Sequence, residues 1–203
     1  MKKFLFFILF AVLSFAASAL CAANTPTSIL DEAVKKFNSG GGVNIGFTLS
    51  AEGNTTSGNI RMLGKKFCCS VDGLTTWFDG KTMWTYVKQN EEVNVTTPSA
   101  SEVAQMNPYM LLSLYKKGYK VSMGKSTNVY HEIVLIGENS GAAFKKIVVR
   151  INKQSLRPMY AYMEKGKSST TITVTSFKNE KLADSTFVFN KKKYPGVDII
   201  DLR

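Results

Sequence analysis

FCCSVDGLTTWFDGKTMWTYVKQNEEVNV, residues 67–95, is the stretch of sequence that decides the fold. It reads as three short β-strands joined by two Asp-Gly turns, Asp72-Gly73 and Asp79-Gly80. Asp-Gly between β-forming runs is a strong hairpin signal, because a type I′ turn needs positive φ at both central residues. The stretch therefore predicts an antiparallel meander.

The two turns also predict which side chains share a face of the sheet. With a two-residue loop at each turn, we expect Cys69 opposite Thr76 and Phe78 opposite Lys81. Because side chains alternate, one face is expected to carry Phe67, Cys69, Val71, Leu74, Phe78, Met83 and Val87. The other is expected to carry Cys68, Trp77, Trp84 and Tyr86 among Ser70, Thr75 and Thr82. A sheet that is apolar on both sides is either covered by two layers or turns one face to a ligand.

Outside the meander, the pattern is mostly that of short strands. Residues 28–38 are expected to form a helix capped by Ser28, and residues 99–117 a helical insertion with a capping box at Ser99–Glu102 and a second start at Asn107-Pro108. Strands are expected at 43–50, 59–63, 93–96, 119–123, 130–136, 144–151, 159–164, 170–177 and 186–189. In all, about eleven evenly spaced strands predict one antiparallel sheet, closed or strongly curved.

The amino terminus resembles a secretory signal. Residues 1–23, MKKFLFFILFAVLSFAASALCAA, have a basic start, an apolar run and small residues before Ala23. They predict an export signal cleaved after Ala23, because the apolar run is too short for a membrane span. A lipoprotein acylated on Cys21 is the alternative, and it is disfavoured because Leu20 stands where such a signal has a small residue.

The expected mature chain, residues 24–203, is in the size range of one domain. Removing residues 1–23 removes two lysines and no acidic residue, so the formal net charge of +11 falls by 2 to +9. A basic surface could attract nucleic acid, anionic lipid or an acidic protein, or it could be simply solvated. For an exported protein we expect no nucleic-acid partner.

No catalytic or metal-binding pattern is visible. His131 is the only histidine, there is no Gly-x-Ser-x-Gly motif, and no cluster has metal-ligand spacing. Gly40–Gly42 follows a helix and does not open one, so it is not a phosphate-binding loop. Cys68 and Cys69 are adjacent and expected to be unbonded, small buried side chains. We therefore expect neither an enzyme nor a cofactor.

Apolar side chains are plentiful, and the helical insertion is apolar nearly all round, so it must be covered on more than one side. A curved sheet with such a helix across it predicts a lidded apolar cavity. For any one residue, ordinary core packing is the more frequent role. As a set, the candidates for the cavity lining are Phe47, Leu49, Ile60, Met62, Leu74, Phe78, Met83 and Trp84 from the sheet, with Met110, Leu111 and Leu114 from the lid.

Several motifs together resemble those of the periplasmic outer-membrane lipoprotein carriers, the LolA family. Residues 78–86, FDGKTMWTY, are similar to that family's Asp-Gly-Lys-x-x-Trp-x-Tyr stretch. Residues 182–189, LADSTFVF, and 195–200, PGVDII, are similar to its closing segment. Asn107-Pro108 with Leu111-Leu112 resembles its mid-chain helix start, and Leu156-Arg157-Pro158 its late turn. The order and spacing hold over essentially all of residues 24–203.

The resemblance implies a mainly β protein, an incomplete antiparallel barrel lidded by helices. It implies a monomeric periplasmic carrier for acylated lipoprotein cargo, loaded by an inner-membrane ABC-type release complex and unloaded at an outer-membrane acceptor. One departure concerns the lid, because Gly64-Lys65 stands where the family commonly has an Arg-Pro whose arginine helps to close it. A sensing or scaffold module that binds a protein, and a lipid or ester hydrolase, are the alternatives.

Overall fold

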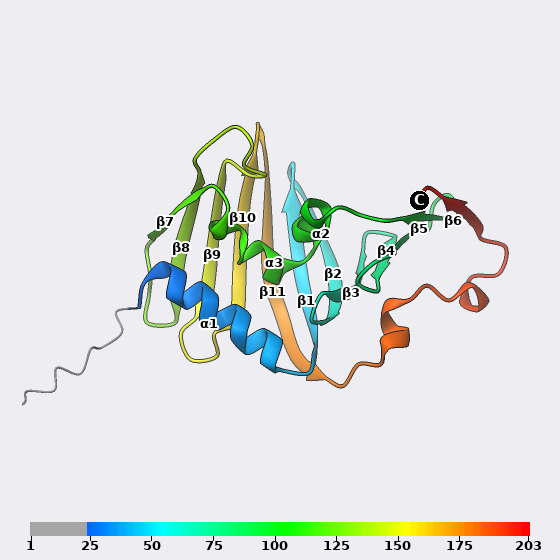
Figure 1. Ribbon diagram of the computed structural model, residues 1–203, viewed down its shortest axis with the longest axis horizontal. Coiled ribbons are helices and arrows are strands. Elements are labelled where there is room, and N and C mark those ends of the chain that lie inside the picture. Colours follow the sequence, from blue (N-terminus) through cyan, green and yellow to red (C-terminus); the bar gives the residue numbers. More distant parts are fainter. Residues whose placement is uncertain (1–23) are drawn as a thin grey trace, which may run out of the picture.

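A computed structural model describes residues 24–203, except for the side chains of Ser101, Ala104, Gln105, Pro108 and Met110. The expected signal peptide, residues 1–23, lies outside the described residues. The described chain forms one twelve-stranded open sheet in the order β12-β6-β5-β4-β3-β2-β1-β11-β10-β9-β8-β7 (Figure 1). The strands are β1 Gly42–Ala51, β2 Asn54–Leu63, β3 Lys66–Val71, β4 Leu74–Phe78, β5 Met83–Val87, β6 Glu92–Thr96, β7 Tyr119–Met123, β8 Tyr130–Gly137, β9 Lys146–Asn152, β10 Pro158–Lys165, β11 Ser168–Glu180 and β12 Asp198–Asp201.

The mainly β, incomplete-barrel architecture expected from the sequence is confirmed, with two differences near the carboxyl end. Residues 186–189, expected as a strand, form none: Thr186 and Phe187 end a 3-10 helix, η2 Asp184–Phe187, and the next two residues are irregular. The last strand, β12, was not expected and pairs with β6 in parallel, whereas all other neighbours are antiparallel. Because a parallel pair joins segments that are far apart in the chain, no local turn motif in the sequence predicts it.

The first Asp-Gly turn is the expected two-residue hairpin. Asp72 and Gly73 both have positive φ, 49° and 74°, as a type I′ turn requires, and Val71 pairs with Leu74 across it. Cys69 accordingly lies opposite Thr76. This part of the predicted register is confirmed.

The second Asp-Gly turn is longer than expected, so the predicted pair of Phe78 with Lys81 is wrong. Phe78 instead pairs with Met83. The Asp79 carboxylate accepts hydrogen bonds from the backbone N–H groups of Lys81 and Thr82, both at 2.8 Å, and this side-chain contact stabilises a four-residue loop. Because the pairing moves by two residues, every side chain keeps its expected face.

Three helices and the 3-10 helix η1 Leu114–Lys116 lie before or between the strands. Helix α1, Pro26–Ser39, begins earlier than expected, because the Thr25 side chain caps it and Pro26 occupies the first turn. Helix α2, Ala100–Met106, has the predicted capping box between Ser99 and Glu102. Helix α3, Pro108–Leu111, begins after Asn107 as expected but lasts only to Leu111, so the second helical piece is shorter than predicted.

The sheet is covered on both faces at the meander, which answers why the meander is apolar on both sides. The helices lie over one face, called the inner face below, where Phe67, Phe78 and Met83 join the main core (Figure 1). The chain after β11 runs past β4–β6 to β12 (Figure 1), and its side chains pack on the other, outer face. There Phe189 and Tyr194 pack on Trp77, with ring centroids 5.4 and 5.7 Å away. Trp84 and Tyr86 pack beside them against Val93, Val95 and Val197.

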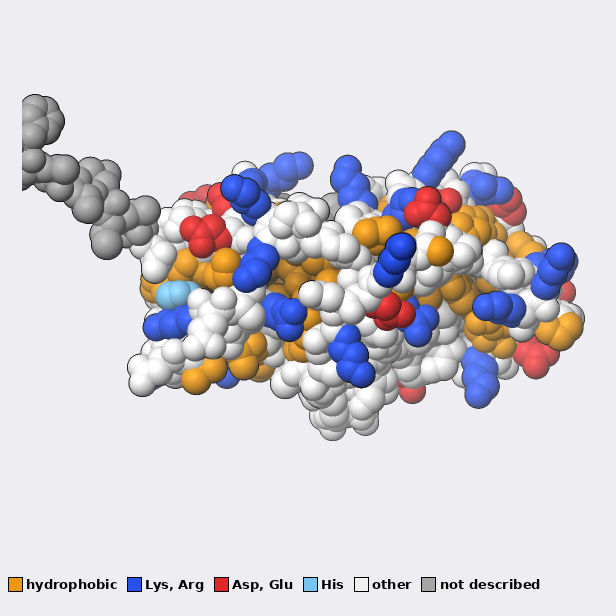
Figure 2. All heavy atoms as spheres, turned by 90° about the horizontal axis from the view of Figure 1, so that it is seen from below, with side chains coloured by type: hydrophobic (Ala, Val, Ile, Leu, Met, Phe, Trp, Pro, Cys, Tyr) orange, Lys and Arg blue, Asp and Glu red, His pale blue; other side chains and the backbone are white. Residues whose placement is uncertain are grey.

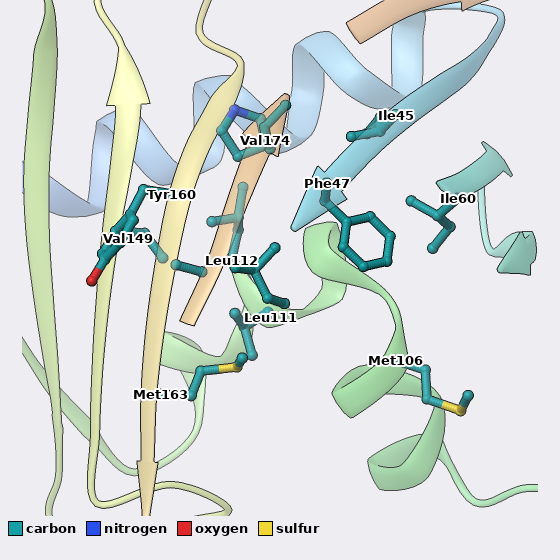
Figure 3. A pocket seen from close by; sticks show the side chains of 13 residues that line it. Ile45, Phe47, Ile60, Met106, Leu111, Leu112, Val149, Tyr160, Met163 and Val174 are labelled. Carbon is teal, nitrogen blue, oxygen red and sulfur yellow. The ribbon is translucent and has the colours of Figure 1, made fainter. Parts of the chain in front are cut away.

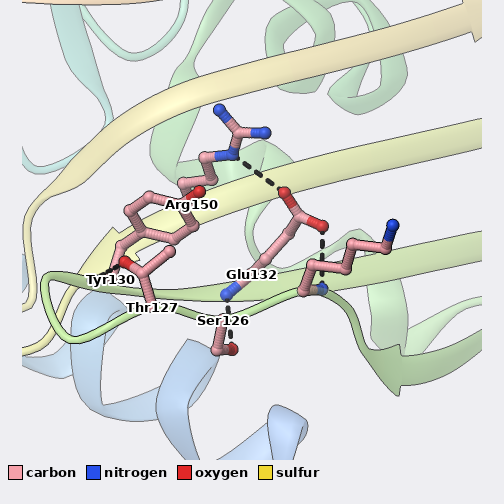
Figure 4. Close-up of polar contacts among 6 residues, drawn as sticks. Ser126, Thr127, Tyr130, Glu132 and Arg150 are labelled. Carbon is pink, nitrogen blue, oxygen red and sulfur yellow. Dashed lines mark hydrogen bonds and ion pairs between the residues drawn. The ribbon is translucent and has the colours of Figure 1, made fainter.

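A polar network stabilises the opposite part of the outer face, where β8 and β9 meet the β7–β8 loop (Figure 4). The Glu132 carboxylate accepts hydrogen bonds from Arg150 Nε at 2.8 Å and from the Lys125 N–H at 3.0 Å. Burial of this carboxyl opposes ionisation, but the two donors outweigh it and lower the pKa of Glu132. The Arg150 guanidinium also lies 5.0 and 4.5 Å from the ring centroids of Tyr130 and Tyr160. The network is satisfied internally and fixes the loop.

Candidate functional site

An apolar pocket lies between the inner face of the sheet and the α2–α3 segment. Its empty volume is about 660 Å³, including open space at its mouth. The lining comes from the middle of the sheet and from α2–α3: Ile45, Phe47, Ile60, Met106, Leu111, Leu112, Val149, Pro158, Tyr160, Ala161, Met163, Ile172 and Val174. Figure 3 shows Leu111, Leu112, Phe47 and Val174 pointing toward one another across it.

Strands β1 and β2 form one wall, and a glycine determines how it is built. Ile45 lies opposite Ile60, and Phe47 lies opposite Gly58. A Cβ atom on Gly58 would overlap the Phe47 ring, so the missing side chain allows the ring to lie across β2. The ring is therefore held at the pocket wall by its own cross-strand neighbour.

Strands β9, β10 and β11 form the opposite wall. Ala161 pairs with Val149 on one side and with Ile172 on the other, so the three side chains form a row on the inner face. Val174 lies opposite Phe47 across the β1–β11 pair and joins the two walls. Antiparallel alternation thus places the apolar side chains that line this wall on one face.

The α2–α3 segment that covers the pocket, called the lid below, is turned at Asn107. The Asn107 Oδ1 atom accepts a hydrogen bond from the Tyr109 N–H at 3.0 Å, which starts α3 and directs Leu111 and Leu112 inward. Both leucines are buried, at 5% and 2% relative exposure. The lid is therefore positioned by a local cap and held by apolar contacts.

Helix α1 contacts the lid itself at one place and the residues that follow the lid at another. The Phe37 and Tyr109 rings stack with centroids 3.6 Å apart. Beyond α3, Asp31 accepts a hydrogen bond from the Tyr115 hydroxyl at 2.7 Å and pairs with the Lys116 ammonium at 3.0 Å. The hydrogen bonds from Tyr115 and Lys116 lower the pKa of Asp31. This Asp31 clasp is exposed, so the lid depends on few polar contacts.

The candidate lining residues from the sequence fall into three groups. Phe47, Ile60 and Leu111 line the pocket. Met62, Phe78 and Met83 are buried in the same inner core, and Leu49 and Leu114 pack against it half-buried, but none of these five lines the pocket. Leu74 is 41% exposed at the end of its hairpin, Trp84 lies on the outer face, and the side chain of Met110 lies outside the described residues.

Sequence reasoning missed the wall from β9–β11, including Val149, Ala161, Met163, Ile172 and Val174. The available signal was the alternation of apolar residues in these strands, which identifies their buried face. It does not say which strands the lid crosses, because that depends on pairing between β1 and β11, far apart in sequence. The pocket lies closer to the middle of the sheet than to the meander.

The chemistry of the pocket is that of a hydrocarbon site. No lining residue carries a charge near neutral pH. His131 lies away from this lining, and partial burial and the charge of Lys153 lower its pKa. Within residues 24–203, no group of three His, Cys, Asp or Glu side chains could hold a metal ion. In the same range, no helix is long and apolar enough to cross a membrane.

Comparison with known proteins identifies the family. A family model described as outer membrane lipoprotein carrier protein LolA matches residues 15–167. The chain belongs to the LolA family. A search of curated proteins gives no match for this LolA-family chain.

Solved structures similar to this chain include the following three. A conserved protein from Thermus thermophilus is 13% identical with a TM-score of 0.62, covering 86% of this chain and 97% of that one. A LolA superfamily protein from Nitrosomonas europaea is 13% identical with a TM-score of 0.41, covering 82% and 99%. The lipoprotein LppX of Mycobacterium tuberculosis is 13% identical with a TM-score of 0.46, covering 78% and 97%. At such identity, the Thermus structure supports the fold alone.

Proposed function

We propose that this protein is a periplasmic carrier that shields the acyl chains of lipoproteins, or of a similar amphiphile, between the inner and outer membranes. The observation that carries the proposal is the uninterrupted apolar lining beneath the lid. In this proposal, residues 1–23 are a cleaved export signal and residues 24–203 are one half-barrel domain. The protein is not an enzyme.

The energetics of acyl chains explain why such a carrier needs a covered apolar site. Each acyl CH₂ buried in an apolar site contributes about 0.8 kcal/mol. Three long chains exposed to water would therefore cost tens of kcal/mol on the same basis. Since the lining offers no charged group to fix a head group, affinity comes from broad apolar contact and release comes from opening the lid.

The lid of this chain is held differently from the pattern expected for the family. Gly64-Lys65, which stands in place of the family's Arg-Pro, lines a second cleft together with Asn107 and Tyr109 of the lid. No arginine lines that cleft. The Phe37–Tyr109 stack and the Asp31 clasp supply contacts between the lid and α1 instead. Loading by an inner-membrane ABC-type complex and unloading at an outer-membrane acceptor would act on these contacts.

The test is ligand binding by the purified, exported protein. Mass spectrometry is expected to find a co-purified fatty-acylated molecule, and an environment-sensitive apolar probe is expected to titrate a saturable site. Leu111→Asp is expected to abolish probe binding, because it places a carboxylate inside the pocket lining.

The matched control is Val197→Asp. It puts the same charge at a buried position of the outer-face cluster, formed by Val93, Val95 and Val197, which lies away from the pocket. It is expected to lower stability but retain probe binding in the folded fraction. A protein with neither bound lipid nor probe binding contradicts the carrier proposal. If Leu111→Asp lowers only stability and leaves probe binding intact, the pocket is not the ligand site and the protein-binding alternative is favoured.

A further inference from the structure

A separate concave site lies on the outer face of the sheet, opposite the lidded pocket. We call it the outer hollow. Its floor is formed on β2–β4 by Arg61, Cys68 and Trp77, which are consecutive cross-strand neighbours. Its wall is the returning chain, residues 185–194. The hollow encloses about 970 Å³ of empty space, including its open mouth.

The returning chain is anchored on both sides of the outer hollow, so the hollow is part of the fold. On one side, Asp184 pairs with Lys66 at 2.8 Å and Phe187 is fully buried. On the other, Phe189 and Tyr194 pack on Trp77. Between these anchors the polar side chains of Ser185, Thr186, Asn190 and Lys193 line the hollow.

The outer hollow is rich in hydrogen-bond donors that have no protein acceptor. Within the described part of the chain, the Trp77 indole N–H, the Tyr194 hydroxyl and the Lys193 ammonium make no hydrogen bond to protein. Trp77 is 8% exposed and is one of the residues that line the hollow. A ligand that fits this arrangement supplies several acceptor atoms.

The charge of the outer hollow is positive. Arg61 and Lys193 line it, and no carboxylate is among its lining residues. Among the described residues, the acid that pairs with Arg61 is Glu180, with Arg61 Nε 3.8 Å from Glu180 Oε2 and side chains that are 46% and 39% exposed. An exposed pair at this separation is weak, so Arg61 can turn to an anion in the hollow.

We propose that the outer hollow binds a phosphate group, carried either by a small soluble phosphate or by the head group of an anionic lipid. Phosphate offers many acceptor oxygens to the guanidinium, ammonium, hydroxyl and indole donors that surround the space. The site lies on the opposite side of the sheet from the acyl pocket, so it is independent of the carrier proposal. The aromatic rings of Trp77 and Tyr194 bound it and leave the phosphate accessible from the mouth.

The test compares two double variants that each remove two positive charges. Arg61→Gln/Lys193→Gln changes the lining, whereas Lys191→Gln/Lys192→Gln changes neighbouring lysines that do not line the hollow. Inorganic phosphate and vesicles containing phosphatidylglycerol are the two probes, with phosphatidylcholine vesicles as the uncharged reference. Binding is followed by tryptophan fluorescence and calorimetry at low ionic strength.

The full-length mature protein is expected to bind at least one phosphate probe saturably. The Arg61→Gln/Lys193→Gln variant is expected to weaken that binding at least about tenfold, because it loses charge-assisted hydrogen bonds. The affinity of the Lys191→Gln/Lys192→Gln variant is expected to stay within about threefold of the wild-type affinity. Saturable binding of inorganic phosphate that vesicles do not compete for assigns a soluble ligand. Preferential binding of phosphatidylglycerol vesicles through Arg61 and Lys193 assigns a lipid head group.

Absence of saturable binding to both probes overturns the proposal, and so does an equal loss in both double variants, which would mean diffuse surface attraction. Apolar-probe binding to the lidded pocket is measured on the same samples and is expected to be unchanged. If Arg61→Gln/Lys193→Gln does not fold, Lys193→Gln alone, in an exposed 3-10 helix, carries the test and is expected to weaken phosphate binding severalfold. No loss in that variant overturns the proposal.

Discussion

At the scale of single residues, the shape of the lidded pocket depends on where a side chain is missing. Gly58 lies opposite Phe47 and leaves room for its ring, and the Ser70 backbone oxygen lies on the other side of the same space. Phe47 is 8% exposed and lines the pocket. A glycine inside a strand is costly for a sheet, so a packing reason of this kind is needed to explain it.

Gly58→Ala is expected to destabilise the protein by about 1–3 kcal/mol, because the new methyl group overlaps the Phe47 ring and forces it from its rotamer. Apolar-probe affinity should fall with it. Urea denaturation and probe titration are the measurements. Gly41→Ala is the control, since no atom lies within 4 Å of a Cβ built there. Equal effects of the two variants would contradict the packing argument.

Residue chemistry also sets the reactivity of the two cysteines. Cys68 and Cys69 are both free, as the sequence predicted from their adjacency. Burial raises the pKa of the Cys69 thiol to about 12 and also raises that of Cys68. Both thiols are therefore protonated near neutral pH and are poor nucleophiles. Cys69 packs against the inner core, whereas Cys68 lines the hollow on the outer face.

At the scale of elements, the lid is a short helical segment held from the side by α1. One end of the contact is the stack of Phe37 on Tyr109, and the other is the Asp31 clasp with Tyr115 and Lys116. The stack is buried and apolar, whereas Asp31 and Lys116 are more than half exposed. Opening at the exposed end therefore costs less than opening at the stack.

Asp31→Asn is expected to lower the unfolding free energy by at most about 1 kcal/mol, because the clasp is solvent-screened. The pKa of Asp31 is lowered in the folded protein, so its contribution is present above about pH 4 and is lost as pH falls through that lowered value. The stability gap between wild type and Asp31→Asn should therefore be constant above about pH 5 and close at lower pH.

The same variant tests the lid. At pH 7, Asp31→Asn is expected to bind the apolar probe faster than wild type in stopped-flow mixing. Asp201→Asn is the control, because Asp201 also pairs with a cation, Arg203, but lies on β12 at the far edge of the sheet. Unchanged probe kinetics in Asp31→Asn would show that the clasp does not limit access to the pocket.

At the scale of the whole molecule, the sheet has a helical layer on its inner face and a returning chain on its outer face. Figure 2 shows Lys and Arg side chains scattered along the length of one side of the molecule, with few acidic side chains among them. The returning chain ends in β12, which pairs with β6 and continues with a hydrogen bond from the Leu202 N–H to the Val95 carbonyl at 2.8 Å. The last residues of the chain thus cover the edge of the outer-face cluster of Val93, Val95 and Val197.

Deleting residues 198–203 is expected to lower the unfolding free energy by about 2 kcal/mol or more, since it removes the β12–β6 pairing beside the buried Val93 and Val95. Tryptophan emission should shift to longer wavelength as Trp84 becomes more exposed to solvent. Urea denaturation and fluorescence are the measurements. Ile199→Ser, at a position 43% exposed, is the control and should have a small effect. An unchanged spectrum in the deletion would mean that β12 does not protect the cluster.

Much of this organisation could be predicted from local sequence. The Asp72-Gly73 turn, the Ser99–Glu102 capping box and the Asn107-Pro108 restart each depend on residues within a few positions of one another, and the structure has all three. The Asp79 loop was predicted with the wrong length. There, the Asp79 carboxylate accepts hydrogen bonds from the backbone N–H groups of Lys81 and Thr82, and these bonds outweigh the two-residue turn that Asp-Gly favours.

By itself, the sequence determined a mainly β chain with a short helical lid, its family, and the face on which each side chain of the meander lies, because these depend on period, turn chemistry and local motif. Only the tertiary structure decided where the apolar pocket and the outer hollow lie. The pocket requires β1 to pair with β11, and the hollow requires residues 185–194 to return across β2–β4. The meander is therefore apolar on both faces because helices cover one face and the returning chain, distant in sequence, covers the other. Contacts with a distant segment leave no local pattern.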